Sequence, residues 1–265
     1  MKKDLPLSLV LGAGGVRGFA HAGALEALVQ AGFQISEIVG TSAGAIIGTL
    51  YAATGLRLDE LVNFGLSMTS RNMLSWAVYR RLPTGAPAVL REHFHRRAGI
   101  IPHYVGHLNK TKGRELCHGV QRLGIVCYDL RRRREAFFVY PGDALPAGEA
   151  ARGSAAIPGF FPSRRYVDEQ QGMRLVDGGL VNGFPVDKLF APPFAPRQIL
   201  VIDVSNKVEA RERNARKVAA LRARHPEIPI EILTPDTLGI GTVLYRKRDL
   251  MKLIEAGRQS VAGIL

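Results

Sequence analysis

The sequence has little cysteine and a deficit of acidic residues. Its two cysteines, Cys117 and Cys127, are spaced as neither a CxxC redox pair nor a metal knuckle. We therefore expect two buried thiols in a reducing compartment. Asp and Glu number 23 against 36 Lys and Arg, which gives a formal charge of +13. Such a basic surface favours anionic partners, namely nucleic acid, an anionic membrane face or phosphate-bearing substrates.

The sequence also lacks an export signal and a clear membrane span. An apolar stretch follows the N-terminal lysines, but Asp4, Pro6 and Arg17 interrupt it, so we predict no signal peptide. Residues 38–56 are uncharged over a length that could cross a bilayer, yet their glycines, serine and threonines would make a poor lipid face. A strand followed by a buried helix fits this run better. We therefore expect a cytoplasmic protein, with peripheral attachment to the inner face of the membrane as one option.

The order of apolar runs predicts the fold class. A short apolar run at 5–11 ends in a glycine cluster, and apolar residues then recur at helical spacing as far as Gly32. A second run at 35–39 leads into a glycine-serine turn and another helix. This β-α-β-α order implies a three-layer α/β/α fold with a mostly parallel central sheet. We expect further strands at 123–128, 136–140, 173–176, 199–204 and 228–233, and helices at 209–224 and 250–261.

A single domain over residues 1–265 is the simplest organisation of the chain. Hydrophobic residues make up 46% of the sequence, and no repeat or low-complexity linker interrupts it. Residues 58–118 are mainly helical in pattern, with interruptions at Pro83, Pro87 and Pro102. We expect this irregular region to be a lid or a substrate-access region, with peripheral packing as the alternative.

The first motif is a glycine-rich loop at 12–18, reading GAGGVRG, between the first strand and the first helix. Glycines there let backbone N–H groups turn outward towards an anion at a helix N-terminus, either a phosphate or an oxyanion. A dinucleotide site is the main competitor. However, the third glycine comes one residue late for GxGxxG, and the second strand ends in a serine turn where that fold has an acidic residue.

The second motif is GTSAG, which spans Gly40 to Gly44 and matches the GxSxG nucleophile elbow. A glycine-rich packing turn would give the same letters, but the position of Ser42 between an apolar strand and an apolar helix favours the elbow. The glycine loop precedes Ser42 by one β-α unit, so both loops emerge at the carboxyl ends of adjacent strands. We therefore expect backbone donors and a nucleophile to face one cleft.

The third motif is Asp177-Gly178-Gly179, directly after the strand expected at 173–176. Glycines beside an aspartate let the backbone turn and leave the carboxylate accessible to a neighbour. The same tripeptide is also a common turn, so the motif alone predicts an accessible carboxylate and no particular role.

Together the motifs resemble the successive blocks of the patatin-like phospholipase family in its bacterial form. The blocks are LVLGAGGVRGFAHAGALEAL at 9–28, then GTSAG, then ARGSAAIPGFFPSRRYVDEQQGMRLVDGGLVNGFPVD at 151–187. The resemblance implies a patatin-like fold, with Ser42 as the nucleophile and Asp177 as its only catalytic partner. It also implies an oxyanion hole at Gly14, Gly15, Arg17 and Gly18, with motif support from Gly12, Ala13, Gly40, Gly44, Gly178 and Gly179.

The sequence departs from the family pattern at Ala13, where a glycine is usual. Alanine keeps its backbone N–H, so donation to an oxyanion survives unless the position needs a positive φ. We therefore expect Gly14 and Gly15 to be the main donors. Arg17 is expected to order the loop or to add positive potential, with packing in a salt bridge as the alternative.

The resemblance implies a serine ester hydrolase that acts on phospholipid or lysophospholipid esters through an acyl-enzyme, without a cofactor. A Ser-His-Asp hydrolase is the near rival, because Ser42, Asp177 or Asp203, and His225 follow the right chain order. A non-catalytic or regulatory protein that binds lipid or a protein partner is the other alternative. His21 is interpreted as a packing histidine, and no metal is expected because the histidines show no ligand spacing.

The arginine run from Arg131 to Arg134 has two interpretations. A solvated hairpin turn is preferred, because charge runs are usually solvated faces. A membrane-docking patch is the alternative, since each basic side chain near an anionic leaflet contributes roughly 1 kcal/mol. Nucleic acid is not an expected partner, because the arginine clusters lack interleaved aromatic residues and a recognisable binding module. The sequence leaves the oligomeric state open.

Overall fold

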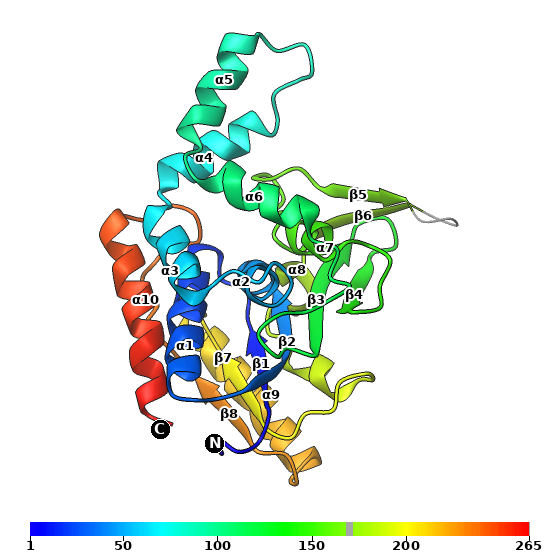
Figure 1. Cartoon of the computed structure of the whole chain (residues 1–265), viewed down its shortest axis with the longest axis vertical. Helices are drawn as coiled ribbons and strands as arrows, with labels where there is room; N and C mark the ends of the chain where they lie inside the picture. The colour runs from blue at the N-terminus through cyan, green and yellow to red at the C-terminus, as the bar shows by residue number, and fades with distance from the viewer. Residues whose placement is uncertain (168–171, 265) are drawn as a thin grey trace.

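The structure is a computed structural model that describes residues 1–167 and 172–264. Residues 168–171, in the third motif block, lie outside the described part. A mixed sheet forms the centre, in the order β5-β6-β3-β2-β1-β7-β8 with β4 paired to β3 (Figure 1). The parallel strands are β1 (Leu7–Leu11), β2 (Ile35–Thr41), β3 (Arg122–Asp129), β7 (Ile199–Ile202) and β8 (Ile230–Leu233). The antiparallel strands are β4 (Arg134–Tyr140), β5 (Arg164–Val167) and β6 (Gly172–Asp177).

The central parallel strands are apolar because helices bury both faces of the sheet. Every residue of β1 and β7 is buried, as expected where helices cover both faces of a sheet. Successive side chains of β1 point to opposite faces, so Leu9 and Leu11 enter one core and Val10 enters the other. The two cores confirm the predicted three-layer α/β/α fold with a mostly parallel central sheet.

Helices cover the two faces of the sheet. One face carries α1 (Phe19–Gln30), α2 (Ala43–Ala52), α3 (Leu58–Ser67) and α10 (Lys247–Ala262), with α1 packed along α10 (Figure 1). The other face carries α9 (Val208–Arg224) and the 3-10 helix η2 (Val186–Phe190). In the described part of the chain, no helix combines the length and the apolarity that crossing a bilayer requires. The uncharged run at 38–56 instead forms the end of β2 followed by α2.

The region 58–118 is mostly helical, as its pattern predicts. It consists of α3, α4 (Ser70–Tyr79), α5 (Ala88–Arg97), α6 (Ile101–Lys110) and the segment that follows. α4 and α5 pack together as an arm that extends beyond the edge of the sheet, whereas α6 lies against α7 (Ala147–Ser154) (Figure 1). The role of this region as a lid or substrate-access region stays a prediction, as does the single-domain organisation.

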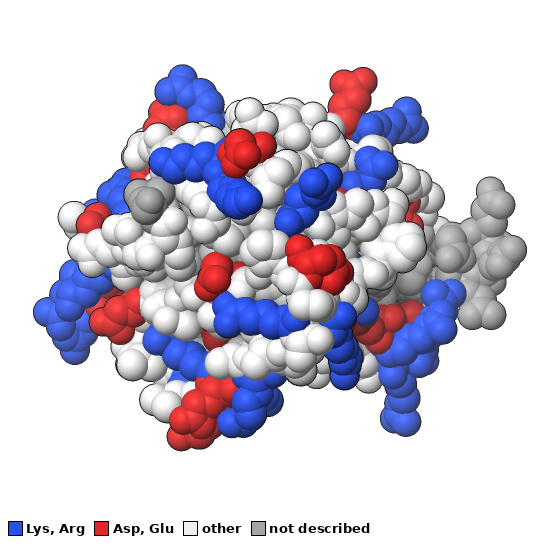
Figure 2. Space-filling model, turned by 90° about the horizontal axis from the view of Figure 1, so that it is seen from below, with Lys and Arg blue, Asp and Glu red and all other residues white. Residues whose placement is uncertain are grey.

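Charges of both signs share the face opposite the arm, where Figure 2 shows Lys and Arg side chains interspersed with Asp and Glu. Arg131 and its neighbours occupy the turn of the β3–β4 hairpin, in which Asp129 stands opposite Arg134. Arg131 Nη1 donates to the carbonyl oxygen of Gly172 at 3.1 Å, and Arg132 Nε lies 3.8 Å from a carboxylate oxygen of Asp129. The run therefore forms a hairpin turn, and its docking to a membrane stays a prediction.

Candidate active site

Ser42 lies at the sharp turn between β2 and α2. Its backbone has φ 55° and ψ −118°, a sparsely populated combination that costs roughly 1–3 kcal/mol. The turn is crowded, since a Cβ atom on Gly44 would lie 2.1 Å from the carbonyl oxygen of Leu11. A strained, crowded strand-to-helix turn of this kind is the geometry of a nucleophile elbow, in which the serine hydroxyl stands at the carboxyl edge of the sheet.

Asp177, the last residue of β6, contacts the Ser42 hydroxyl. Ser42 Oγ donates a hydrogen bond to Asp177 Oδ2 at 2.7 Å, and the N–H of Gly179 donates to Asp177 Oδ1 at 2.7 Å. β6 reaches this position by pairing with the end of β3, where Asp177 stands opposite Cys127. Burial raises the pKa of Asp177, and the hydrogen bonds from Ser42 and Gly179 counteract part of this rise. The pair therefore joins a hydroxyl to a carboxylate that is more basic than a free aspartate.

A third side chain, Ser154 at the end of α7, holds the elbow. Its buried Oγ accepts a hydrogen bond from the N–H of Ser42 at 2.8 Å and donates one to the carbonyl oxygen of Val126 in β3. The carbonyl oxygen of Ser154 accepts from the N–H of Gly178 at 3.1 Å. Ser154 is thus bonded to the elbow and to the aspartate motif. Sequence reasoning missed this residue, and the only signal for it was its position in the third family-like block.

The glycine loop after β1 leads into the short 3-10 helix η1 (Gly15–Gly18). The N–H of Ala13 donates to the carbonyl oxygen of Gly183 at 2.8 Å, so this group is engaged inside the fold. No described residue accepts a hydrogen bond from the N–H of Gly14 or Gly15. Gly15 has φ 57°, a left-handed conformation that favours glycine, and it lines the same cavity as Ser42. The N–H groups of Gly14 and Gly15 are therefore available to a ligand, and Gly15, unlike Gly14, lines the cavity.

The Arg17 side chain donates to oxygen atoms of two later segments of the chain, one at Val204 after β7 and one at 240–242 before α10. Its Nε donates to the carbonyl oxygen of Val204 at 2.9 Å, and its Nη1 donates to the carbonyl oxygen of Ile240 at 3.1 Å and to Thr242 Oγ1 at 3.3 Å. Burial, and then the positive charge of Arg211, lower the pKa of the Arg17 guanidinium. These contacts fasten the glycine loop to its surroundings, which favours the loop-ordering role over direct contact with an oxyanion.

The residues of the Ser-His-Asp alternative do not come together. His225 lies at the amino end of β8, whereas Ser42 follows the carboxyl end of β2, and the parallel order of β2, β1, β7 and β8 places these at opposite edges of the sheet. His225 stacks on Phe190 with 4.1 Å between ring centroids. Asp203 accepts a hydrogen bond from the Asn214 side chain at 2.9 Å. The structure therefore gives Ser42 an aspartate partner and leaves His225 remote from it.

His21 is buried near the start of α1, and its ring contacts Gly12, the first residue of the glycine loop. Its Nε2 lies 2.8 Å from the carbonyl oxygen of Gly12, and burial lowers the pKa of His21 to about 4. The ring is therefore neutral at physiological pH and donates its Nε2–H to Gly12. This contact agrees with the interpretation of His21 as a packing histidine. Within residues 1–167 and 172–264, no three His, Cys, Asp or Glu side chains gather as metal ligands would.

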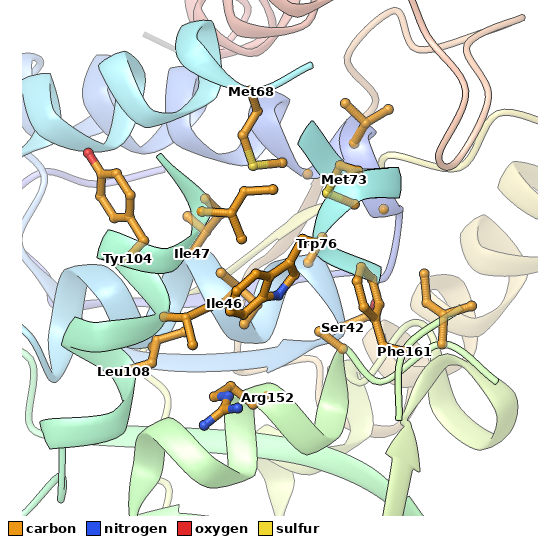
Figure 3. Close-up of a pocket in the computed structure, with 18 of the residues that line it drawn as sticks. Ser42, Ile46, Ile47, Met68, Met73, Trp76, Tyr104, Leu108, Arg152 and Phe161 are labelled. Carbon is orange, nitrogen blue, oxygen red and sulfur yellow. The ribbon is translucent and has the colours of Figure 1, made fainter. Parts of the chain in front are cut away.

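An apolar cavity opens above Ser42 (Figure 3). The space in it that is open to water-sized molecules measures about 190 Å³. Its walls come from η1, α2, the helices α3, α4 and α6 of the region 58–118, and the segment from α7 to β5. Most of the lining side chains are apolar, and they include Ile46, Ile47, Met68, Met73, Trp76 and Leu108 (Figure 3). Such a cavity suits a hydrocarbon chain that carries a reactive group at the level of Ser42.

A family model described as patatin-like phospholipase matches residues 9–190, which include the glycine loop, the elbow and the aspartate motif. The chain belongs to this family. Members of the family are in general lipid acyl hydrolases, and the fold described above is the patatin-like fold. The resemblance that the three motif blocks indicate is thereby confirmed.

Curated relatives and a solved structure show similarity to this patatin-like chain. It is 30% identical over 184 residues to an uncharacterized NTE family protein of Mycobacterium tuberculosis, covering 68% of this chain and 44% of the relative. It is 27% identical over 207 residues to patatin-like phospholipase domain-containing protein 6 of Homo sapiens, covering 77% of this chain and 14% of that protein. The crystal structure of VipD from Legionella pneumophila has a TM-score of 0.48 and 13% identity, over 97% of this chain and 67% of that chain. The chain thus spans less than half the length of these two curated relatives.

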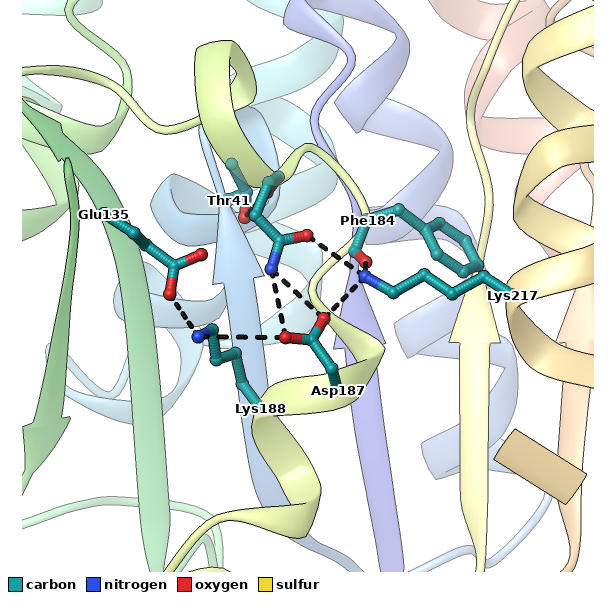
Figure 4. A network of polar contacts seen from close by, with 7 residues as sticks. Thr41, Glu135, Phe184, Asp187, Lys188 and Lys217 are labelled. Atoms are coloured by element: carbon teal, nitrogen blue, oxygen red, sulfur yellow. Dashed lines mark hydrogen bonds and ion pairs between the residues drawn. The ribbon is translucent and has the colours of Figure 1, made fainter. Parts of the chain in front are cut away.

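A polar network ties the segment after the aspartate motif of the patatin-like fold to its neighbours (Figure 4). Lys217 Nζ in α9 donates to Asp187 Oδ1 at 2.6 Å and to the carbonyl oxygen of Phe184 at 2.9 Å. Asn182, which ends α8 (Gly179–Asn182), donates to Asp187 at 3.1 Å and accepts from Thr41 Oγ1 at 2.9 Å through its carbonyl oxygen. Burial alone would raise the pKa of Asp187, but the hydrogen bonds from Lys217 and Asn182 lower it below its usual value. The network fixes α8 against the strand end that leads into the elbow.

Proposed function

We propose that the chain is a serine carboxylic ester hydrolase that cleaves acyl esters of phospholipids or lysophospholipids, with Ser42 and Asp177 as a catalytic dyad. The observation that carries this proposal is the 2.7 Å hydrogen bond from Ser42 Oγ to Asp177 Oδ2 at a strained elbow beside an apolar cavity. A nucleophile with a base in hydrogen-bond contact is the arrangement that acyl transfer requires. Membership of a family of lipid acyl hydrolases supports the same reaction class.

The reaction proceeds in two steps. Ser42 Oγ attacks the ester carbonyl carbon while its proton passes to Asp177, and the N–H groups of Gly14 and Gly15 donate to the oxyanion of the tetrahedral intermediate. The C–O bond to the leaving alcohol breaks, and the alcohol takes the proton from Asp177. A water molecule then attacks the acyl-enzyme as Asp177 accepts its proton. The second intermediate releases the fatty acid, and the proton returns to Ser42 Oγ.

The environment of Asp177 makes an aspartate workable as the base. A free aspartate has a pKa of about 3.9 and is a poor proton acceptor at neutral pH. Burial raises the pKa of Asp177, so its affinity for the serine proton is higher than in water. The 2.7 Å contact from Gly179 N–H to the other carboxylate oxygen keeps the carboxyl group aimed at Ser42.

In this proposal, the region 58–118 forms the access side of the cavity. Met73 and Trp76 of α4 line it, and the α4–α5 arm at 70–99 carries six arginines against one acidic residue, Glu92. Val89 on the arm is 80% exposed. Basic and exposed apolar side chains on one element favour contact with an anionic membrane surface. We therefore propose peripheral contact of the arm with the inner face of the membrane, in the cytoplasm.

Cosedimentation with anionic vesicles over a range of salt concentrations tests the membrane contact. Bound protein should decrease as ionic strength rises and as the anionic lipid fraction falls, because the attraction is screened. Binding that ignores both variables overturns the electrostatic contact, and it leaves the proposed reaction untouched.

Hydrolysis of a lysophospholipid and of a p-nitrophenyl acyl ester tests the dyad. Ser42→Ala and Asp177→Asn should each lower kcat by at least about 10³-fold, because each removes a member of one catalytic unit. His225→Ala is the matched control and should keep wild-type activity, since His225 lies at the opposite edge of the sheet. An inactive His225→Ala enzyme would contradict the dyad. A wild-type protein that binds these lipids without turnover would instead favour the non-catalytic alternative.

A further inference from the structure

Three arginines are the charged side chains that line the cavity above Ser42. Arg80 follows the last residue of α4, Arg152 lies in α7 and Arg164 begins β5, so three separate elements bring them together. Within the described chain, no acidic side chain lines the cavity with them. We call Arg80, Arg152 and Arg164 the arginine cluster. In Figure 3, Arg152 lies in the cavity wall near Ile46 and Leu108.

Glu149 neutralises only part of the arginine cluster. Arg152 Nη1 donates to Glu149 Oε1 at 2.8 Å, and Arg164 Nε donates to Glu149 Oε2 at 2.8 Å. Arg80 is exposed and forms no ion pair with any described residue, and its guanidinium lies 5.8 Å from the centre of the Trp76 ring. Three positive charges against one negative charge leave an excess of two. The wall of an apolar cavity thus carries positive charge, partly buried and partly exposed, that an anionic ligand would compensate.

The fold holds the guanidinium groups close together against their mutual repulsion. The side chains of Arg152 and Arg164 are only 12% and 24% exposed. Burial, and then the positive charge of Arg164, lower the pKa of Arg152 to about 10 and also lower the pKa of Arg80. Asn109 accepts a further hydrogen bond from Arg152 and helps to fix its position. Planar guanidinium groups held in this way match the oxygen atoms of a phosphate.

We propose that the arginine cluster binds the phosphate group of the substrate, so that the enzyme prefers acyl esters bearing an anionic phosphate over neutral acylglycerols. This inference rests on the proposed function, because it places the ester at Ser42 and the phosphate at the cluster. Both line one cavity, and in a glycerophospholipid only a few bonds separate the ester from the phosphate. The apolar walls then accept the acyl chain, while the arginines select the head group.

A matched pair of substrates tests the preference. For the same acyl chain, kcat/KM should be at least about tenfold higher for 1-acylglycerol 3-phosphate than for 1-acylglycerol, the effect of one charge-assisted hydrogen bond. Arg80→Gln and Arg164→Gln should each lower this ratio about tenfold, mainly through KM for the phosphate ester. Arg216→Gln is the control, because Arg216 is an exposed arginine of α9, on the other face of the sheet and outside both the cavity and the arm. It should keep the wild-type ratio.

The outcomes separate this inference from the proposed function. Equal kcat/KM for the two substrates, with hydrolysis that still depends on Ser42, overturns the phosphate preference and leaves the hydrolase intact. If the wild type hydrolyses no ester, the proposed function fails, and calorimetry on Ser42→Ala tests the arginine cluster alone. That variant should bind 1-acylglycerol 3-phosphate at least about tenfold more tightly than 1-acylglycerol, and equal affinities overturn the inference. Inorganic phosphate that binds as tightly as the phosphate lipid would assign the arginine cluster to a soluble phosphate and overturn it too.

Discussion

Replacing Ser154 by alanine should damage both the stability and the chemistry of the elbow. The Ser154 hydroxyl accepts from the N–H of Ser42 and donates to the carbonyl oxygen of Val126, and all three residues are buried. Its removal leaves the buried N–H of Ser42 without its partner, at about 1–3 kcal/mol, and removes one hydrogen bond to the carbonyl oxygen of Val126, at about 0.5–1.5 kcal/mol more. The hydrogen bond from the Ser42 N–H to Ser154 also holds Ser42 at φ 55°, a conformation that is itself strained by roughly 1–3 kcal/mol. Without it, the backbone of Ser42 relaxes and its Oγ moves away from Asp177.

Urea unfolding and steady-state kinetics on one lysophospholipid together measure the two effects. We expect Ser154→Ala to lose several kcal/mol of unfolding free energy, and its kcat to fall by about 10²-fold with little change in KM, as for a reacting atom displaced by about 1 Å. Ser154→Cys should lie between the wild type and Ser154→Ala, because a thiol is a weaker donor and acceptor. It also provides an informative variant if the alanine protein does not fold.

Ser8→Ala is the matched control for this experiment. Ser8 is also a buried serine in the sheet, and its Oγ donates to Glu37 Oε2 at 2.6 Å, but it lies near the amino end of β1, remote from the elbow. This variant should lose stability while each folded molecule keeps its wild-type kcat. A Ser154→Ala enzyme that behaves like Ser8→Ala, with lower stability and unchanged kcat, would refute the positioning role of Ser154.

The other predictions concern Asp177, His21 and Gly15. The kcat/KM of the wild type should rise with pH as Asp177 loses its proton. Because burial raises the pKa of Asp177, the midpoint of this rise should lie above about 3.9, the pKa of a free aspartate. A pH–rate profile with a midpoint at or below that value contradicts the role of Asp177 as the base. The unfolding free energy should decrease by about 3 kcal/mol as pH falls from about 6.5 to about 4, because the unfolded chain binds a proton at His21 before the folded chain does. The variant His21→Gln keeps a donor for the carbonyl oxygen of Gly12, and in urea titrations it should lack this part of the pH dependence. Gly15→Ala should lower kcat, since the new Cβ would lie 2.4 Å from the carbonyl oxygen of Thr242 and the φ of 57° disfavours alanine; wild-type kinetics for this variant would show that the loop adapts.

The hydrophobic pattern predicted the strands that are buried on both faces. β1 and β7 are continuous apolar runs, so their sequence alone indicates a parallel sheet covered by helices. β5 (Arg164–Val167) was not predicted, because two arginines and an exposed valine make no apolar run. It is a strand only through its pairing with β6, a contact that residue types do not encode. The sequence therefore predicts the strands that are apolar runs, including β8 at one edge of the sheet, and misses β5 at the other edge.

The sequence predicts the site residues that belong to a short motif, but not those that tertiary contacts alone bring to the site. Ser42 and Asp177 each lie in a short motif beside an apolar strand, and the family resemblance linked them before the structure showed their 2.7 Å contact. Ser154 bonds to Ser42 across 112 residues of sequence, because α7 packs back onto β3. Nothing in its immediate neighbours distinguishes it from any other serine after a glycine. Roles of this kind become visible only when the fold brings distant segments together.

The arginines show why the position of a charge matters more than its prominence in the sequence. The most conspicuous run, Arg131 to Arg134, lies at a hairpin turn where three of its four side chains are exposed and water screens them. Arg80, Arg152 and Arg164 come from three separate elements and line one apolar cavity. Arg80 is exposed, whereas Arg152 and Arg164 are mostly buried there, where electrostatic attraction is stronger than in water.

Replacing Arg131 and Arg133 by glutamine should therefore leave the preference for the phosphate ester unchanged, whereas Arg80→Gln should lower it. The same pair of substrates, 1-acylglycerol 3-phosphate and 1-acylglycerol, provides the measurement. If the hairpin variant loses the preference as Arg80→Gln does, then head-group selection follows the overall charge of +13 and not the arginines that line the cavity.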